Sequence, residues 1–86
     1  MAKAAQPAME VKIFSPYRVF YQGNGVSVSA INKTGRFDVL YNHANFFTLL
    51  LPGQITVNTG YQKLNFPIKS GVLKVSQNHA TAFVDI

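Results

Sequence analysis

The chain has 86 residues, of which 48% are hydrophobic, enough for one small core and too few for two domains. It contains no cysteine, so disulfides, thiolate metal ligands and cysteine nucleophiles are excluded. The eight lysines and arginines outnumber the three acidic residues, and the resulting net charge of +5 favours negatively charged partners.

The first nine residues differ in character from the rest of the chain. Residues 1–8 are mostly small and lack the apolar centre of a secretion signal. The longest apolar stretch of the sequence, 46–52, is far short of the roughly 20 residues that cross a bilayer, so we expect no membrane insertion. We therefore predict a disordered leader or an expression remnant at 1–9 and a single domain at 10–86.

Apolar and polar residues alternate with a period of two along most of the remaining chain, which predicts strands rather than helices. In chain order, the alternating segments are 10–15, 17–21, 26–31, 37–42, 55–57, 61–67, 73–75 and 80–86. Turn residues separate them at 23–25, 32–35, 52–53, 58–60, 70–71 and 77–78. This series of short strands predicts an all-β sandwich or barrel with mostly antiparallel neighbours.

One face of these segments is apolar and predicts the core. Its members are Val11, Ile13, Val28, Phe37, Val39, Ile55, Val57, Leu64, Phe66, Leu73, Val75, Ala82 and Val84. Pro67 places its segment at an edge or a strand break, because proline cannot donate to the sheet ladder. Leu40 is an apolar residue on the face that should be exposed to solvent, which indicates a contact surface.

The tract 42–50 does not follow the alternation. Together with Leu51, which follows it, the tract holds apolar residues too densely for a single sheet face to bury them all: Phe46, Phe47, Leu49, Leu50 and Leu51. We expect some of them to be exposed at a docking surface. The alternative is a loop that folds over one open end of the sandwich and plugs the core with the same side chains.

Catalytic chemistry is not indicated. The two histidines and three carboxylates are far apart in sequence, and no serine lies in a recognisable nucleophile motif. His43 and His79 could bind a metal with Asp38 or Asp85, but their spacing does not indicate a site. The glycines at 23–25 are followed neither by a helix nor by the lysine of a phosphate loop. We expect a non-enzymatic protein without a cofactor or a metal.

Lysines interleaved with aromatic residues also occur in small β-barrels that bind single-stranded nucleic acid, where bases stack on exposed rings. Most rings of this chain, Phe37 and Phe66 among them, fall on the predicted core face, which disfavours that function. Nucleic acid is therefore not the expected partner. It remains the alternative to a protein-binding role, and such binding would weaken steeply as salt rises.

Several motifs follow one another in a specific order. A first strand ends at Ser15, Tyr21-Gln22-Gly23 follows, and a Phe-Asp-Val-Leu strand occupies 37–40. The sequence Asn-His-Ala-Asn-Phe-Phe-Thr-Leu-Leu at 42–50 is the most specific, and a Pro-Gly strand at 51–57 and a hairpin at 69–85 follow it. Over residues 10–86 this order resembles the N-terminal β-sandwich domain of the epsilon subunit of F-type ATP synthases.

The resemblance implies a flattened antiparallel sandwich of two roughly five-stranded sheets. It implies a non-catalytic rotor-stalk component that joins the gamma subunit to the c ring on the cytoplasmic face of the membrane, and we expect the isolated domain to be a monomer. Partner contacts are implied at Ser15, Arg36, His43 and Thr48, and the dense apolar tract adds Phe46. For Ser15, His43 and Thr48, hydrogen bonds that shape turns are the alternative.

Three features depart from the family pattern. Tyr41-Asn42 stands where the family usually has Pro-Gly, although asparagine tolerates left-handed turn conformations. Arg36 stands where the family often has an acidic residue facing basic loops of the c ring, which implies an altered charge pairing. The pair of C-terminal helices usual in the family is not encoded in these 86 residues.

Overall fold

The computed structural model describes residues 8–86, and in this part of the chain it contains nine β-strands and no helix. The strands are β1 (Met9–Phe14), β2 (Val19–Gly25), β3 (Ser27–Asn32), β4 (Gly35–Leu40), β5 (Phe46–Leu50), β6 (Gly53–Asn58), β7 (Lys63–Ile68), β8 (Ser70–Ser76) and β9 (His79–Asp85). Short turns connect most of them, as the sequence predicts.

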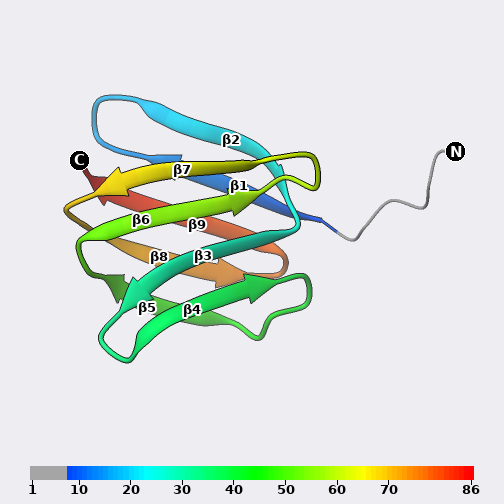
Figure 1. Cartoon of the computed structure of the whole chain (residues 1–86). Helices are drawn as coiled ribbons and strands as arrows, with labels where there is room; N and C mark the ends of the chain where they lie inside the picture. The colour runs from blue at the N-terminus through cyan, green and yellow to red at the C-terminus, as the bar shows by residue number, and fades with distance from the viewer. Residues whose placement is uncertain (1–7) are drawn as a thin grey trace, which may run out of the picture.

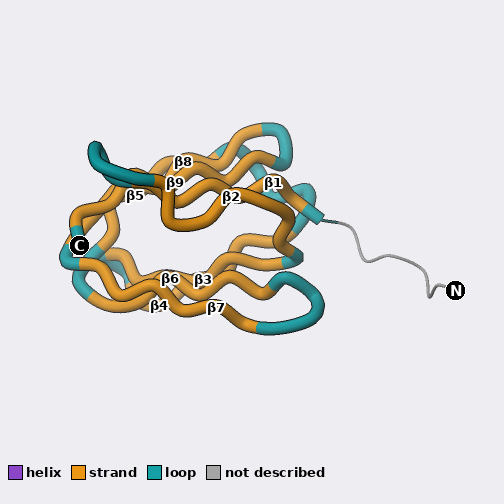
Figure 2. The backbone as a smooth tube through the Cα atoms, turned by 90° about the horizontal axis from the view of Figure 1, so that it is seen from above, coloured by secondary structure: helices purple, strands orange, loops and turns teal. Residues whose placement is uncertain are grey.

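The strands form two sheets that lie face to face (Figures 1 and 2). Sheet A has five strands in the order β2-β1-β9-β8-β5, and sheet B has four in the order β4-β3-β6-β7. Both sheets are open at their edges, so the fold is a sandwich and the barrel alternative is wrong. The predicted all-β sandwich is confirmed.

One pair of neighbours breaks the antiparallel pattern. The first and last strands, β1 and β9, run parallel in the middle of sheet A, with Glu10 opposite His79 and Phe14 opposite Phe83. Every other neighbouring pair in residues 8–86 is antiparallel. A parallel pair needs a long crossover connection, and here the other seven strands provide it.

The core lies between the sheets and consists of aliphatic side chains. Ten of the predicted core residues are buried: Val11, Ile13, Val28, Val39, Ile55, Val57, Leu73, Val75, Ala82 and Val84. Met9 is also buried, at 1% exposure, and opens β1. The predicted leader at 1–9 lies outside the described residues except for Ala8 and Met9, and Met9 is the first residue of β1.

Three predicted core residues are only half-buried. Phe37 lies on β4, and Leu64 and Phe66 lie on β7. These two strands are the edges of sheet B, where an inward side chain has a neighbouring strand on one side only. Phe37 and Phe66 still pack against the core. The prediction of the face on which they lie is therefore right, and the prediction that they are fully part of the buried core is wrong.

The predicted turn at Gly23-Asn24-Gly25 is instead the end of β2, paired with the first residues of β1. Gly25 is buried, and a Cβ at this position would lie 3.0 Å from Val11 Cγ2 and 3.1 Å from Val57 Cγ1. The glycine is therefore needed for close packing where the chain passes from sheet A to sheet B. The bend itself follows at Val26.

Candidate partner-binding surface

Ser15 lies in the turn between β1 and β2. Its Oγ accepts a hydrogen bond from the Tyr17 N–H at 3.2 Å, and its own N–H donates to the Arg18 carbonyl at 2.9 Å. These are the bonds of a turn-forming serine. The turn presents Tyr17, which is 91% exposed, at one end of the sandwich.

Arg36 is exposed on β4, opposite Ile31 of β3, on the outer face of sheet B. It borders two shallow depressions of about 230 and 220 Å³, which it shares with Ser29 and Thr56. The surroundings are polar, because Ser29 donates a hydrogen bond to Asp38 and Thr56 donates one to Asn65. Arg36 is therefore available to an acidic partner, but it lies on a different face from the apolar tract.

His43 lies in the connection between β4 and β5, residues 41–45, which we call the histidine loop, and Phe46 is the first residue of β5. The His43 N–H donates to the Leu40 carbonyl at 3.0 Å, and its ring meets the Phe46 ring edge-on at 5.3 Å. Phe46 meets Phe37 in the same way at 5.5 Å and packs against the core. Phe46 is thus mainly a support for the histidine loop.

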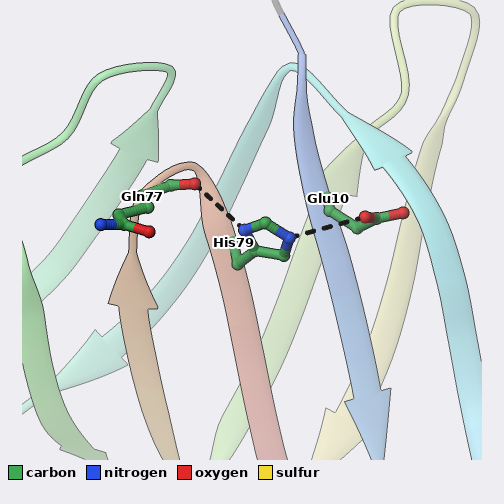
Figure 3. A network of polar contacts seen from close by, with 3 residues as sticks. All are labelled: Glu10, Gln77 and His79. Carbon is green, nitrogen blue, oxygen red and sulfur yellow. Dashed lines mark hydrogen bonds and ion pairs between the residues drawn. The ribbon is translucent and has the colours of Figure 1, made fainter.

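The histidine loop is tied to the β8–β9 turn. The Asn42 N–H donates to Asn78 Oδ1 at 2.7 Å, and both asparagines have a positive φ, a conformation that asparagine tolerates. The β8–β9 turn also contacts β1, through His79 (Figure 3). The Nδ1 atom of His79 lies 3.0 Å from the Gln77 carbonyl oxygen, and its Nε2 atom lies 3.7 Å from Glu10 Oε1 on β1. These contacts hold the loop against sheet A.

Thr48 faces the interior of the sandwich from β5. Its Oγ1 accepts a hydrogen bond from Asn32 Nδ2 on β3 at 3.1 Å, and nearby the Leu51 N–H donates to the Ile31 carbonyl at 2.9 Å. The first bond joins β5 of sheet A to β3 of sheet B, and the second joins the residue that follows β5 to β3. The hydroxyl of Thr48 is therefore occupied by a bond within the domain.

The five candidates do not form one surface. Figure 1 shows the β1–β2 turn and the β3–β4 turn at one end of the sandwich and the β4–β5 connection at the other. Ser15 lies in the β1–β2 turn, and Arg36 is the second residue of β4, directly after the β3–β4 turn. The tract 42–50 is also not a loop over an open end, because residues 46–50 form the edge strand β5. Phe46 and Leu50 face inward, while Phe47 and Leu49 remain 68% and 66% exposed, so the expected exposure in this tract is confirmed.

The exposed side chains of β5 belong to a longer feature on the outer face of sheet A, which we call the apolar row. In register across all five strands it consists of Val19, Phe14, Phe83, Val72 and Leu49. Val19, Phe83 and Leu49 are 49%, 42% and 66% exposed. Phe14 and Phe83 stack edge-on at 5.1 Å. The sequence pattern hides this row, because its members come from five separate segments.

A groove of about 610 Å³ adjoins the apolar row at the end of the sandwich that carries Tyr17. Its lining is mostly apolar and includes Leu49, Leu51, Val72 and Phe83. Leu51 is 45% exposed in the β5–β6 connection. Groove and row form one continuous apolar surface, of the kind that marks a protein-binding site.

Other functional chemistry is not apparent in the described residues. Within 8–86, no group of three or more histidine and carboxylate side chains could hold a metal ion. Nor do these residues include a helix of the length and hydrophobicity that a membrane span requires.

The comparisons with known proteins agree with the resemblance. Residues 8–86 match the family described as ATP synthase, Delta/Epsilon chain, beta-sandwich domain. The ATP synthase epsilon chain of Protochlamydia amoebophila is 43% identical over 60 residues, which are 69% of this chain and 41% of that protein. The epsilon chain of Nitratiruptor sp. is 35% identical over 90% of this chain and 60% of its own length. The chain thus spans 41% to 60% of the length of these relatives.

Solved structures show the same fold at low identity. A chain of the Tetrahymena thermophila mitochondrial ATP synthase central stalk and c ring superimposes with a TM-score of 0.80 at 16% identity, covering 96% of this chain and 67% of that one. A chain of the Euglena gracilis mitochondrial ATP synthase gives a TM-score of 0.82 at 18% identity, covering 96% of this chain and 54% of that one. With the order of motifs and the nine-stranded sandwich, these matches establish that the chain belongs to the ATP synthase delta/epsilon family and that residues 8–86 are its β-sandwich domain.

Proposed function

We propose that this domain is a non-catalytic component of the central stalk of a proton-translocating F-type ATP synthase. In this role it joins the gamma subunit to the c ring on the cytoplasmic face of the membrane. Its relatives named ATP synthase epsilon chains support the proposal. The observation that carries it is the apolar row, which crosses sheet A from edge to edge and remains solvent-exposed in the isolated chain.

The apolar row with its groove is the proposed contact for gamma. Burying its exposed side chains against a complementary subunit would gain about 25 cal/mol for each Å² of apolar surface removed from water. The row rests on five hydrogen-bonded strands whose opposite side is the buried core, so little conformational freedom would be lost on docking. A rigid face of this kind suits a part that must transmit torque.

The end of the sandwich beyond the groove is the proposed contact for the c ring. The β1–β2 turn with Tyr17 and the β3–β4 turn before Arg36 both project there (Figure 1). Arg36 and Lys33 make this end basic, so the polar loops that meet it should carry acidic groups. The interaction would be mechanical, without a cofactor.

Binding of the cognate gamma subunit to the 86-residue chain tests the proposal. Leu49→Asp places a charge in the apolar row and is expected to weaken gamma binding at least about tenfold, since a buried unpaired charge is strongly unfavourable. Leu40→Asp is the matched comparison, because Leu40 is likewise exposed, at 56%, but lies on the opposite outer face of the sandwich, in sheet B, so the two variants test which face meets gamma.

The melting temperatures of both variants, measured by circular dichroism, should fall by similar small amounts, because each substitution places the same side chain at an exposed strand position. Gamma binding that is abolished equally by both substitutions, or affected by neither, would contradict the assignment of the row. No binding of the wild-type chain to gamma at any concentration would contradict the proposed function itself.

A further inference from the structure

A second row of outward side chains runs beside the apolar row, and we call it the lysine row. In register it consists of Gln22, Lys12, Thr81, Lys74 and Phe47. It lies one pleat repeat away from the apolar row, about 7 Å along the strands. The outer face of sheet A is therefore apolar along one line, and along the next it carries two lysines among its five side chains.

Neither lysine is neutralised within the domain. Among residues 8–86, the one ion pair joins His79 and Glu10, in the following row. Lys12 leans toward the apolar row, with its Nζ 4.9 Å from the centre of the Phe14 ring. A partner that covers the apolar row would therefore remove Lys12 partly from water, and an unpaired ammonium there would oppose docking.

We propose that the gamma segment docked on the apolar row carries carboxylates along one side, placed to pair with Lys12 and Lys74. This inference rests on the proposed function. Lys12 and Lys74 are separated by the single strand β9, so the carboxylates they select should be about 10 Å apart. The matching apolar stripe should be about 19 Å long, which is four strand spacings.

The charge pattern fixes the orientation of the partner as well as its composition. A symmetrical apolar stripe could dock in either direction along the row. Lysines on one side favour the direction that brings carboxylates beside them and disfavour the reverse, because like charges or unpaired charges are costly at an interface. The apolar row thus supplies contact area, and the lysine row supplies register.

The test measures gamma binding by the chain with Lys12→Glu and Lys74→Glu together. The matched control is Lys63→Glu, an exposed lysine at the start of β7 in sheet B. At about 0.1 M NaCl, where the Debye length is about 10 Å, the double reversal should weaken binding at least about tenfold and the control less than about twofold. At about 1 M NaCl, where the Debye length is about 3 Å, most of the difference should disappear.

The double variant Lys12→Gln with Lys74→Gln removes both charges without reversing them. Its melting temperature shows whether a loss of binding results from a loss of folding. This variant should give a smaller loss of affinity with the same dependence on salt. Unchanged gamma affinity in both double variants would overturn the inference while leaving the proposed function intact. Absence of gamma binding by the wild-type chain would overturn the proposed function. Salt-sensitive binding of a single-stranded oligonucleotide that is lost in the same variants, without gamma binding, would overturn both.

Discussion

Two leucines on neighbouring strands lie on opposite faces of sheet A and can be compared directly. Leu73 on β8 is 1% exposed, whereas Leu49 on the neighbouring strand β5 is 66% exposed. Truncation to alanine removes three carbons, about 2.4 kcal/mol of transfer free energy if all were buried. For Leu73 a residual cavity adds to this, so Leu73→Ala should lower the free energy of unfolding by about 3 to 4 kcal/mol. For Leu49, about a third of the transfer term applies, or about 0.8 kcal/mol.

Urea denaturation followed by circular dichroism measures both changes. A domain of this size has a free energy of unfolding of about 4 to 13 kcal/mol and a slope of about 1 kcal/mol per molar urea. The Leu73→Ala midpoint should therefore fall by about 3 M, against less than 1 M for Leu49→Ala. Binding to gamma should show the reverse order, with the larger loss for Leu49→Ala. Equal destabilisation by the two substitutions would show that the assignment of the faces is wrong.

Three further substitutions probe other features. Thr48→Val removes the acceptor of the Asn32 amide between the sheets and should cost about 1 kcal/mol in urea denaturation; an unchanged midpoint would show that this bond contributes nothing. Gly71→Ala would place a Cβ 2.8 Å from the Phe83 carbonyl oxygen, a backbone atom, and should destabilise by about 1 to 3 kcal/mol. A wild-type melting temperature for this variant would contradict so close an approach of β8 and β9. His43→Asp should reduce gamma affinity without changing the melting temperature, and either collapse of the fold or unchanged affinity would argue against a docking role for this loop.

The strand pattern predicts which face of each strand points inward but not where the strand lies in its sheet. Phe37, Leu64 and Phe66 are on the predicted face yet half-buried, because β4 and β7 are edge strands. Alternation along a segment is the same for an edge strand and a central one. Pro67 is a local signal that correctly predicts an edge position for β7. The full strand order depends on pairing between distant segments, as in the β1–β9 pair, which the sequence pattern does not specify.

The strand β5 was missed because both of its faces carry apolar side chains and its one polar residue points inward. Its polar residue, Thr48, points inward to Asn32, while Phe47 and Leu49 point outward. An exposed apolar position and an inward hydroxyl together erase the alternation that identifies a strand. Local rules are expected to fail most often at functional sites, and β5, where they fail here, carries one end of the apolar row.

The candidate partner contacts stay predictions, and the sequence alone could not show how their side chains are used within the domain. Ser15 and Thr48 have the right residue types for contacts, but their hydroxyls bond within the domain. Only the register between strands brings Phe14, Val72 and Leu49 into one line with the others. The sequence shows each of these residues as an isolated apolar position.

The parallel pairing of the first and last strands also constrains the kinetics of folding. The centre of sheet A cannot form until β9 reaches β1, and their paired residues lie 69 positions apart, as for Glu10 and His79. Before that, the β1–β2 hairpin and the β8–β5 pair have no common neighbour in sheet A. Closure of so long a loop is entropically costly, and folds dominated by such contacts form in milliseconds to seconds. A ribosome-bound chain would therefore keep the two halves of sheet A apart until its last strand has emerged.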